Sequence, residues 1–143
     1  MQSAALARWA AKKSDLYPND DDLAQLIVDE AMESISEFSS KIPFDKDETA
    51  KKAKREEFLK SVLPLYMNLF CTRIKESGGP FICGKNITVA DLFIYGQLHG
   101  IIYSGNFDYF PKDVLEKNFP LVHTLYKSVD AHAITRAELD AKI

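Results

Sequence analysis

The sequence contains few cysteines, few residues that break helices and no long apolar run. Its two cysteines, Cys71 and Cys83, are too few for a disulfide scaffold and suit a reducing compartment, so we expect a cytoplasmic protein. The 143 residues include six glycines and six prolines, which leaves long stretches free for helices. No apolar run approaches the ~20 residues that a membrane span needs. The first residues also lack the apolar core and cleavage pattern of a signal peptide.

The sequence also lacks an excess of positive charge. It has 18 Lys and Arg against 21 Asp and Glu, which gives a formal net charge of -3. A protein that binds nucleic acid without sequence preference needs a basic face to displace phosphate counterions. The charge balance therefore argues against nucleic acid as a partner of this protein. Hydrophobic residues make up 46% and charged residues 27%, close to the average for globular domains. We therefore expect one folded domain with a hydrophobic core.

The apolar residues follow helical spacing along the whole chain, and no alternation typical of strands is present. Three aspartates, Asp20 to Asp22, are typical of a helix start because carboxylates oppose the positive end of the helix dipole. Pro64 lies inside a long helical pattern and is expected to kink it. The sequence predicts an all-α fold. The expected helices cover residues 2–13, 23–38, 48–77, 89–102, 112–117, 121–132 and 135–142.

The sharpest local signal is a predicted capping box at Thr88 and Asp91. Thr88 can accept a hydrogen bond from the backbone N–H of Asp91, while the Asp91 carboxylate reaches back to the N–H of Thr88. Ile87 and Leu92 stand at the two positions of a hydrophobic staple around this box. The helix that follows is apolar on nearly every side, which predicts a helix at the buried centre of a bundle.

Five segments, in order, resemble the cytosolic glutathione transferase family. Residues 2–10, QSAALARWA, resemble the helix that closes the family's thioredoxin-like domain. Residues 27–29 (IVD) and 62–64 (VLP) are similar to parts of its helical C-terminal domain. Residues 81–92, FICGKNITVADL, resemble the segment that holds the family's capping box, and residues 119–122, FPLV, the start of its penultimate helix. The sigma-like branch, with its helminth, insect and prostaglandin-synthesising members, is the most similar.

The resemblance implies how the chain is organised. Residues 1–13 would be the last helix of an otherwise absent thioredoxin-like N-terminal domain, 14–19 a linker, and 20–143 the helical C-terminal domain. The tyrosine, serine or cysteine that activates the glutathione thiol would lie in the absent domain, so no residue here is assigned a catalytic role.

The resemblance implies a homodimeric transferase that conjugates small electrophiles with glutathione, its co-substrate, or isomerises them. Such an activity would serve detoxification. The alternative is a non-catalytic assembly or structural module, because the same helical domain also serves that purpose.

Three residues are candidates for binding glutathione. Ser3 opens a helix, where free amides form an anion site, although an ordinary helix cap is the alternative. The resemblance implies that Gln2 and Ser3 hold the γ-glutamyl carboxylate. It also implies that Glu33, four residues after Asp29, reaches across the dimer to the glutathione amino group. A solvated helix face is the alternative for Glu33.

The resemblance also places an acceptor-substrate pocket at Ile35, Phe38, Phe93 and Gln97. For the three apolar residues, packing in the core is the alternative. The three histidines lack metal-ligand spacing, and we expect no metal. His99, on a nearly all-apolar helix, is expected to be a core histidine with a satisfied hydrogen bond.

Overall fold

The computed structural model describes residues 3–132, and these residues form helices, with a single isolated bridge between Phe81 and Gly84. The prediction of an all-α fold is confirmed for this part of the chain. The expected helix at 135–142 lies outside the described residues. The elements are α1 (Ser3–Ala11), α2 (Asp22–Ser40), α3 (Glu48–Ser77), α4 (Val89–Leu98), a π-helical segment η1 (His99–Tyr103), α5 (Val114–Asn118) and α6 (Pro120–Ala131).

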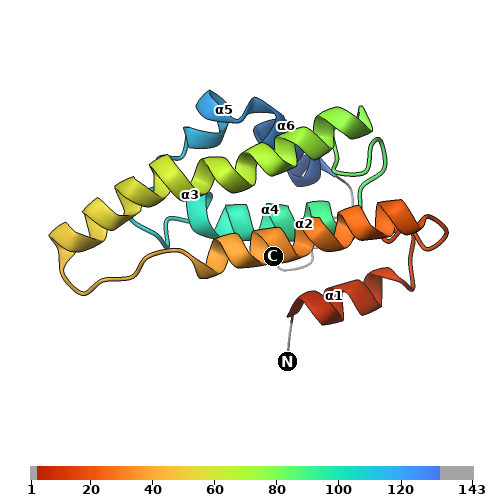
Figure 1. The fold of residues 1–143 in the computed structure, drawn as a ribbon, viewed down its shortest axis with the longest axis horizontal. Coiled ribbons are helices and arrows are strands. Elements are labelled where there is room, and N and C mark those ends of the chain that lie inside the picture. Colours follow the sequence, from red (N-terminus) through yellow and green to blue (C-terminus); the bar gives the residue numbers. More distant parts are fainter. Residues whose placement is uncertain (1–2, 133–143) are drawn as a thin grey trace.

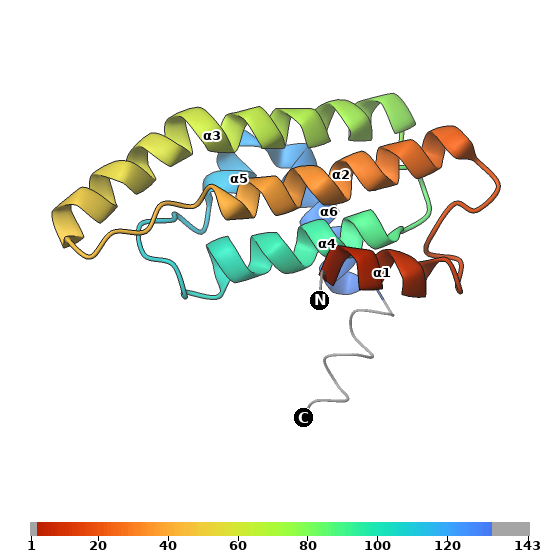
Figure 2. The same cartoon turned by 60° about the horizontal axis from the view of Figure 1, so that its bottom comes forward.

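The helices form a bundle around α2 and α4 (Figures 1 and 2). The long helix α3 runs alongside α2, which packs against α3 on one side and α4 on another. Helix α6 packs against α3 and α4, and the short α5 packs against α6. Helix α1 packs against α4 and is set apart from the main bundle. Within the described residues, none of these helices combines the length and apolar character that crossing a membrane requires.

Helix α2 begins where the run of aspartates predicts. The Asp21 side chain caps it by accepting the backbone N–H of Ala24 at 3.0 Å. The apolar spacing predicts a buried stripe at Leu23, Ile27, Ala31, Ile35 and Phe38, and its last three members are buried. For Leu23 the prediction is wrong, because its side chain is 67% exposed. Glu33 and Ser36 lie on the polar side of the helix. The buried residues of α2 are Val28, Ala31, Met32, Ile35 and Phe38.

Helix α3 runs without interruption through Pro64. It ends where predicted, because Gly78 takes the left-handed conformation with φ 69° and caps the last turn. The sequence pattern marks residues 48–57 as a solvated helix start, and for Arg55 this prediction is wrong. Arg55 is only 4% exposed. Its guanidinium donates to the Asp108 carbonyl oxygen at 2.9 Å and lies over nearby aromatic rings, which accounts for the burial of a charge.

The capping box at Thr88 and Asp91 is confirmed. Asp91 is fully buried, and its carboxylate accepts the N–H of Thr88 at 2.7 Å and the N–H of Ile82 at 2.8 Å. The Thr88 hydroxyl donates to the same carboxylate at 2.7 Å. Burial outweighs these bonds and raises the pKa of Asp91 above its usual value. The box therefore fixes the segment before α4 to the helix itself.

The continuous helix expected over 89–102 changes character at its end. After Leu98 the backbone widens into the π-helical segment η1. His99, the first residue of η1, is exposed, so its prediction as a core histidine is wrong. Its hydrogen bond is nevertheless satisfied, because Nδ1 lies 2.8 Å from the hydroxyl oxygen of Tyr126.

Candidate functional site

A cavity of about 410 Å³ lies between the start of α1, the middle of α2 and the side of α4. This volume is in the range of sites that hold small molecules. The backbone and side chains of three helices therefore converge on one space. The lining residues are Ser3, Ala4, Ala5, Arg8, Glu33, Ser36, Ser39, Phe93 and Gln97.

The cavity brings together four of the residues that the sequence analysis singled out, namely Ser3, Glu33, Phe93 and Gln97. Ile35 and Phe38 do not reach it, because both are 0% exposed and pack in the core. They lie on the inward stripe of α2, and the side of the helix that faces the cavity carries Glu33 and Ser36 instead. Gln2 lies outside the described residues.

Arg8 connects α1 to α2 at one edge of the cavity. Its Nε donates to Asp29 Oδ1 at 2.6 Å, and its Nη2 donates to Glu33 Oε1 at 3.0 Å. The Tyr17 hydroxyl also lies against the Asp29 carboxylate, at 3.2 Å from Oδ2. One arginine thus holds two carboxylates one helical turn apart, and it fixes Glu33 beside the start of α1.

Two groups of this cluster, Arg8 and Tyr17, have shifted pKa values. Burial disfavours the Arg8 cation, but its hydrogen bonds to Glu33 and Asp29 outweigh that cost and raise the pKa of Arg8. Burial and then the Asp29 carboxylate raise the pKa of Tyr17. Arg8 therefore stays charged and Tyr17 stays protonated at neutral pH, so neither group is suited to accept a proton.

Ser3 is the first residue of α1 that the structure describes, and Ala4 and Ala5 follow it along the helix. All three residues line the cavity. Free N–H groups at the positive end of a helix dipole are a ready site for an anion such as a carboxylate.

The α4 side of the cavity combines an apolar wall with an oriented amide. Phe93 supplies the wall. Gln97 Oε1 lies 2.9 Å from the Ser39 hydroxyl oxygen, which directs the two N–H groups of the Gln97 amide away from Ser39. This end can hold an apolar ligand group that carries a hydrogen-bond acceptor.

The sequence analysis assigned no site role to Arg8, Ser36 or Ser39, although all three line the cavity. A signal for the serines was present, since residues 33, 36 and 39 are spaced by three and share one side of a helix. Arg8 stood within the quoted segment 2–10, but pairing across 21 residues with Asp29 leaves no trace in local spacing.

Two further features bear on the chemistry of the site. No tyrosine or cysteine is among the described residues that line the cavity. Across residues 3–132, no three His, Cys, Asp or Glu side chains are grouped in a way that could hold a metal ion. The described lining therefore combines charged, hydroxyl and apolar side chains, without a tyrosine or a cysteine.

Comparison with known proteins places these features in a family. Residues 34–134 match the family described as "Glutathione S-transferase, C-terminal domain". The chain is 25% identical over 125 residues to the glutathione S-transferase class-mu 28 kDa isozyme of Schistosoma japonicum. That match covers 85% of this chain and 57% of the relative, so the chain spans little more than half the length of the curated relative.

Solved structures share the fold. Prostaglandin synthase D of Nilaparvata lugens is similar with a TM-score of 0.79 and 24% identity, over 97% of this chain and 67% of that one. The sigma class glutathione transferase of Fasciola hepatica has a TM-score of 0.77 and 23% identity, over 99% of this chain and 65% of the other. The match to the family over most of the chain, together with this shared fold, shows that the chain belongs to the glutathione S-transferase family and corresponds to its C-terminal domain.

Proposed function

We propose that this chain is the C-terminal half of a cytoplasmic glutathione transferase that conjugates or isomerises small electrophiles. In this proposal residues 1–13 close a thioredoxin-like domain that supplies the thiol-activating residue, 14–19 form a linker, and 20–143 form the helical domain. Exposed Leu6 and Trp9 on α1 support it, because a further domain would cover them. The sigma-like branch rests on the sequence resemblance alone.

The observation that carries the proposal is the cavity where the start of α1 meets Glu33 and Phe93. The γ-glutamyl end of glutathione carries a carboxylate and an ammonium group a few ångströms apart, so it needs donors and a negative charge close together. In this proposal the Ser3 hydroxyl and backbone N–H groups at the beginning of α1 would supply the donors. In the proposed dimer, Glu33 of the second subunit would supply the negative charge.

Glu33 has two possible roles within this proposal. In the structure it pairs with Arg8 of its own chain, while its side chain remains 67% exposed. That exposure leaves room for contact with glutathione bound by a second copy, which is the role that the resemblance implies. We propose a homodimer in which Glu33 of one subunit reaches the Ser3 site of the other.

The acceptor substrate would lie at the α4 end of the cavity. Phe93 would contact its apolar part, and the Gln97 amide would donate to an oxygen or nitrogen acceptor. The thiolate of glutathione would then attack the electrophilic carbon, and the protein would orient the two reactants. Activity of this kind would remove reactive electrophiles, which is why we propose a detoxification role.

The test is glutathione affinity, measured by calorimetry in a protein that joins this chain to the proposed N-terminal domain. Ser3→Ala and Glu33→Gln are each expected to weaken binding, by about 1 to 3 kcal/mol where the charged contacts are shielded from water. Glu37→Gln is a matched control, since Glu37 is exposed on the same helix and pairs with Lys41 outside the cavity.

Unchanged affinity in both the Ser3 and Glu33 variants would overturn the proposed site. Sedimentation of the same protein tests the dimer. A protein that binds no glutathione but assembles with other chains would favour the alternative of a non-catalytic module.

A further inference from the structure

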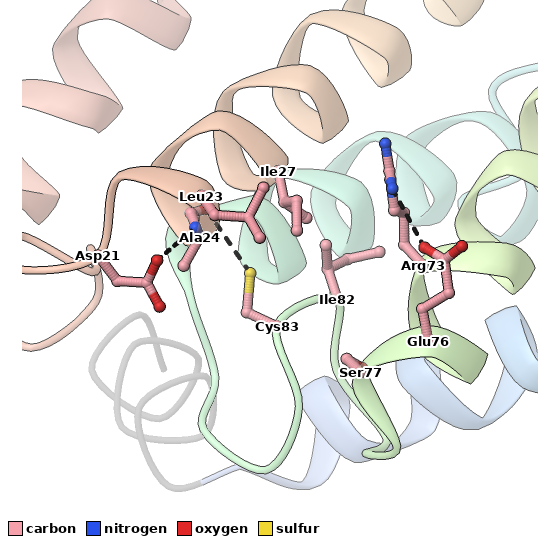
Figure 3. Close-up of a pocket in the computed structure, with 9 residues that line it drawn as sticks. All are labelled: Asp21, Leu23, Ala24, Ile27, Arg73, Glu76, Ser77, Ile82 and Cys83. Carbon is pink, nitrogen blue, oxygen red and sulfur yellow. Dashed lines mark hydrogen bonds and ion pairs between the residues drawn. The ribbon is translucent and has the colours of Figure 1, made fainter.

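A second cavity, of about 370 Å³, lies between the beginning of α2, the end of α3 and the segment that precedes α4 (Figure 3). It shares no lining residue with the cavity beside α1. The proposed transferase reaction therefore leaves it without a role. Its lining residues are Asp21, Leu23, Ala24, Ile27, Arg73, Glu76, Ser77, Ile82 and Cys83.

One side of this cavity is apolar. Leu23, Ile27 and Ile82 form the wall. Leu23 is 67% exposed. The Cys83 thiol lies between these residues and Asp21, with its sulfur 3.9 Å from the Ala24 carbonyl oxygen. A ligand with an apolar group would remove this exposed surface from water.

The charged groups of the cavity disfavour an anion. Arg73 Nη2 lies 2.7 Å from Glu30 Oε2, and Nη1 lies 3.1 Å from Glu76 Oε2. Two carboxylates therefore already neutralise the guanidinium, and the pKa of Arg73 is raised by its hydrogen bond to Glu30. Arg73 has no free positive charge to offer to a ligand.

Asp21 is the remaining charged group; it is exposed and forms no ion pair with any residue from 3 to 132. Its Oδ1 accepts the Ala24 N–H, whereas Oδ2 has no hydrogen-bond partner among the described residues. The start of α2 contributes about half a positive charge. The carboxylates of Asp20, Asp21 and Asp22 together outweigh it.

The negative field of this rim reaches the cavity interior. Burial is the main cause that raises the pKa of the Cys83 thiol to about 11, and the carboxylates of Asp91 and Asp21 add to it. The raised pKa keeps Cys83 protonated at neutral pH, so the cysteine is part of the wall and not a nucleophile.

We propose that this cavity binds a small amphipathic cation, an ammonium group attached to one compact aromatic or branched aliphatic group. The apolar group lies against Leu23, Ile27 and Ile82. The ammonium group lies at the Asp21 carboxylate and donates to Oδ2.

The first test compares three probes of matched size by calorimetry, namely 2-phenylethylammonium, neutral 2-phenylethanol and anionic 3-phenylpropanoate. The ammonium probe is expected to bind at least about threefold more tightly than the alcohol, and the anion least. Equal binding of the ammonium probe and the alcohol would overturn the charge assignment. Failure of the ammonium probe to bind would overturn the site.

Variants then locate the probe. Asp21→Asn removes the charge but keeps an oxygen that caps α2, so the fold is retained and ammonium binding is expected to fall about threefold or more. Asp22→Asn is the matched control, because it removes the neighbouring charge, which does not line the cavity. Equal weakening by both asparagine variants would show that the probe binds elsewhere.

Discussion

Asp91 illustrates how much one buried carboxylate can hold in place. It accepts hydrogen bonds from the N–H of Ile82, the N–H of Thr88 and the Thr88 hydroxyl, and it is 0% exposed. Asp91→Ala would leave buried donors without an acceptor. We expect it to lower the free energy of unfolding by about 2 to 4 kcal/mol, measured by urea denaturation.

Val89→Ala provides the comparison, because it truncates a buried side chain in the same turn without touching the hydrogen bonds. Its expected cost is about 1 to 2 kcal/mol. An Asp91→Ala protein that unfolds at the same urea concentration as the parent would show that the capping box contributes little.

Cys83 supplies a prediction about pH. The folded-state pKa of about 11 lies above the value of about 8.5 for an unfolded thiol, so the folded state keeps its proton where the unfolded state loses it. The protonated Cys83 thiol therefore contributes its full share to the stability of the folded state below about pH 8.5, and this contribution is lost as the pH rises toward 11. We expect the free energy of unfolding of the parent to fall more steeply over this window than that of Cys83→Ala. Parallel pH profiles for the two proteins would contradict the raised pKa.

At the scale of elements, Arg8 determines how α1 is attached. Helix α1 is nine residues long, too short to be stable alone, so its contacts with α2 and α4 must hold it. The pairs of Arg8 with Asp29 and Glu33 are the ionic part of that attachment. In Arg8→Ala we expect backbone amides of α1 to exchange hydrogen faster, while those of α4 are unchanged.

Lys13→Ala is the control for this experiment, since Lys13 follows the helix and lies over the Trp9 ring without an ion pair. It is expected to leave exchange in α1 nearly unchanged. If Arg8→Ala and Lys13→Ala behave alike, apolar packing alone holds α1.

At the scale of the whole molecule, we expect the described cavity to bind glutathione without activating its thiol. We propose that the thiol-activating residue lies in the N-terminal domain, and Glu33 is held by Arg8. We therefore expect the 143-residue chain alone not to conjugate glutathione to 1-chloro-2,4-dinitrobenzene faster than buffer. Turnover that exceeds the buffer rate and disappears on denaturation would contradict this prediction.

The sequence by itself determined the local structure wherever a few neighbouring residues decide it. The aspartates before α2, the glycine after α3 and the Thr88–Asp91 box each specify a structure within one or two helical turns, and all three appear as predicted. The quoted segments also identified the family, because their order along the chain is itself a property of the sequence.

Only the tertiary structure decided which side chains meet. Ile35 and Phe38 were expected in the acceptor pocket, but the packing of α2 on α3 and α4 turns them into the core. Arg8 lies at the site because folding places α1 beside α2. Arg55 is buried because its guanidinium packs against the rings of Phe107 and Phe110, which are distant in the sequence. Periodicity states which residues share a face of a helix, whereas the partner of that face depends on contacts between segments far apart in the chain.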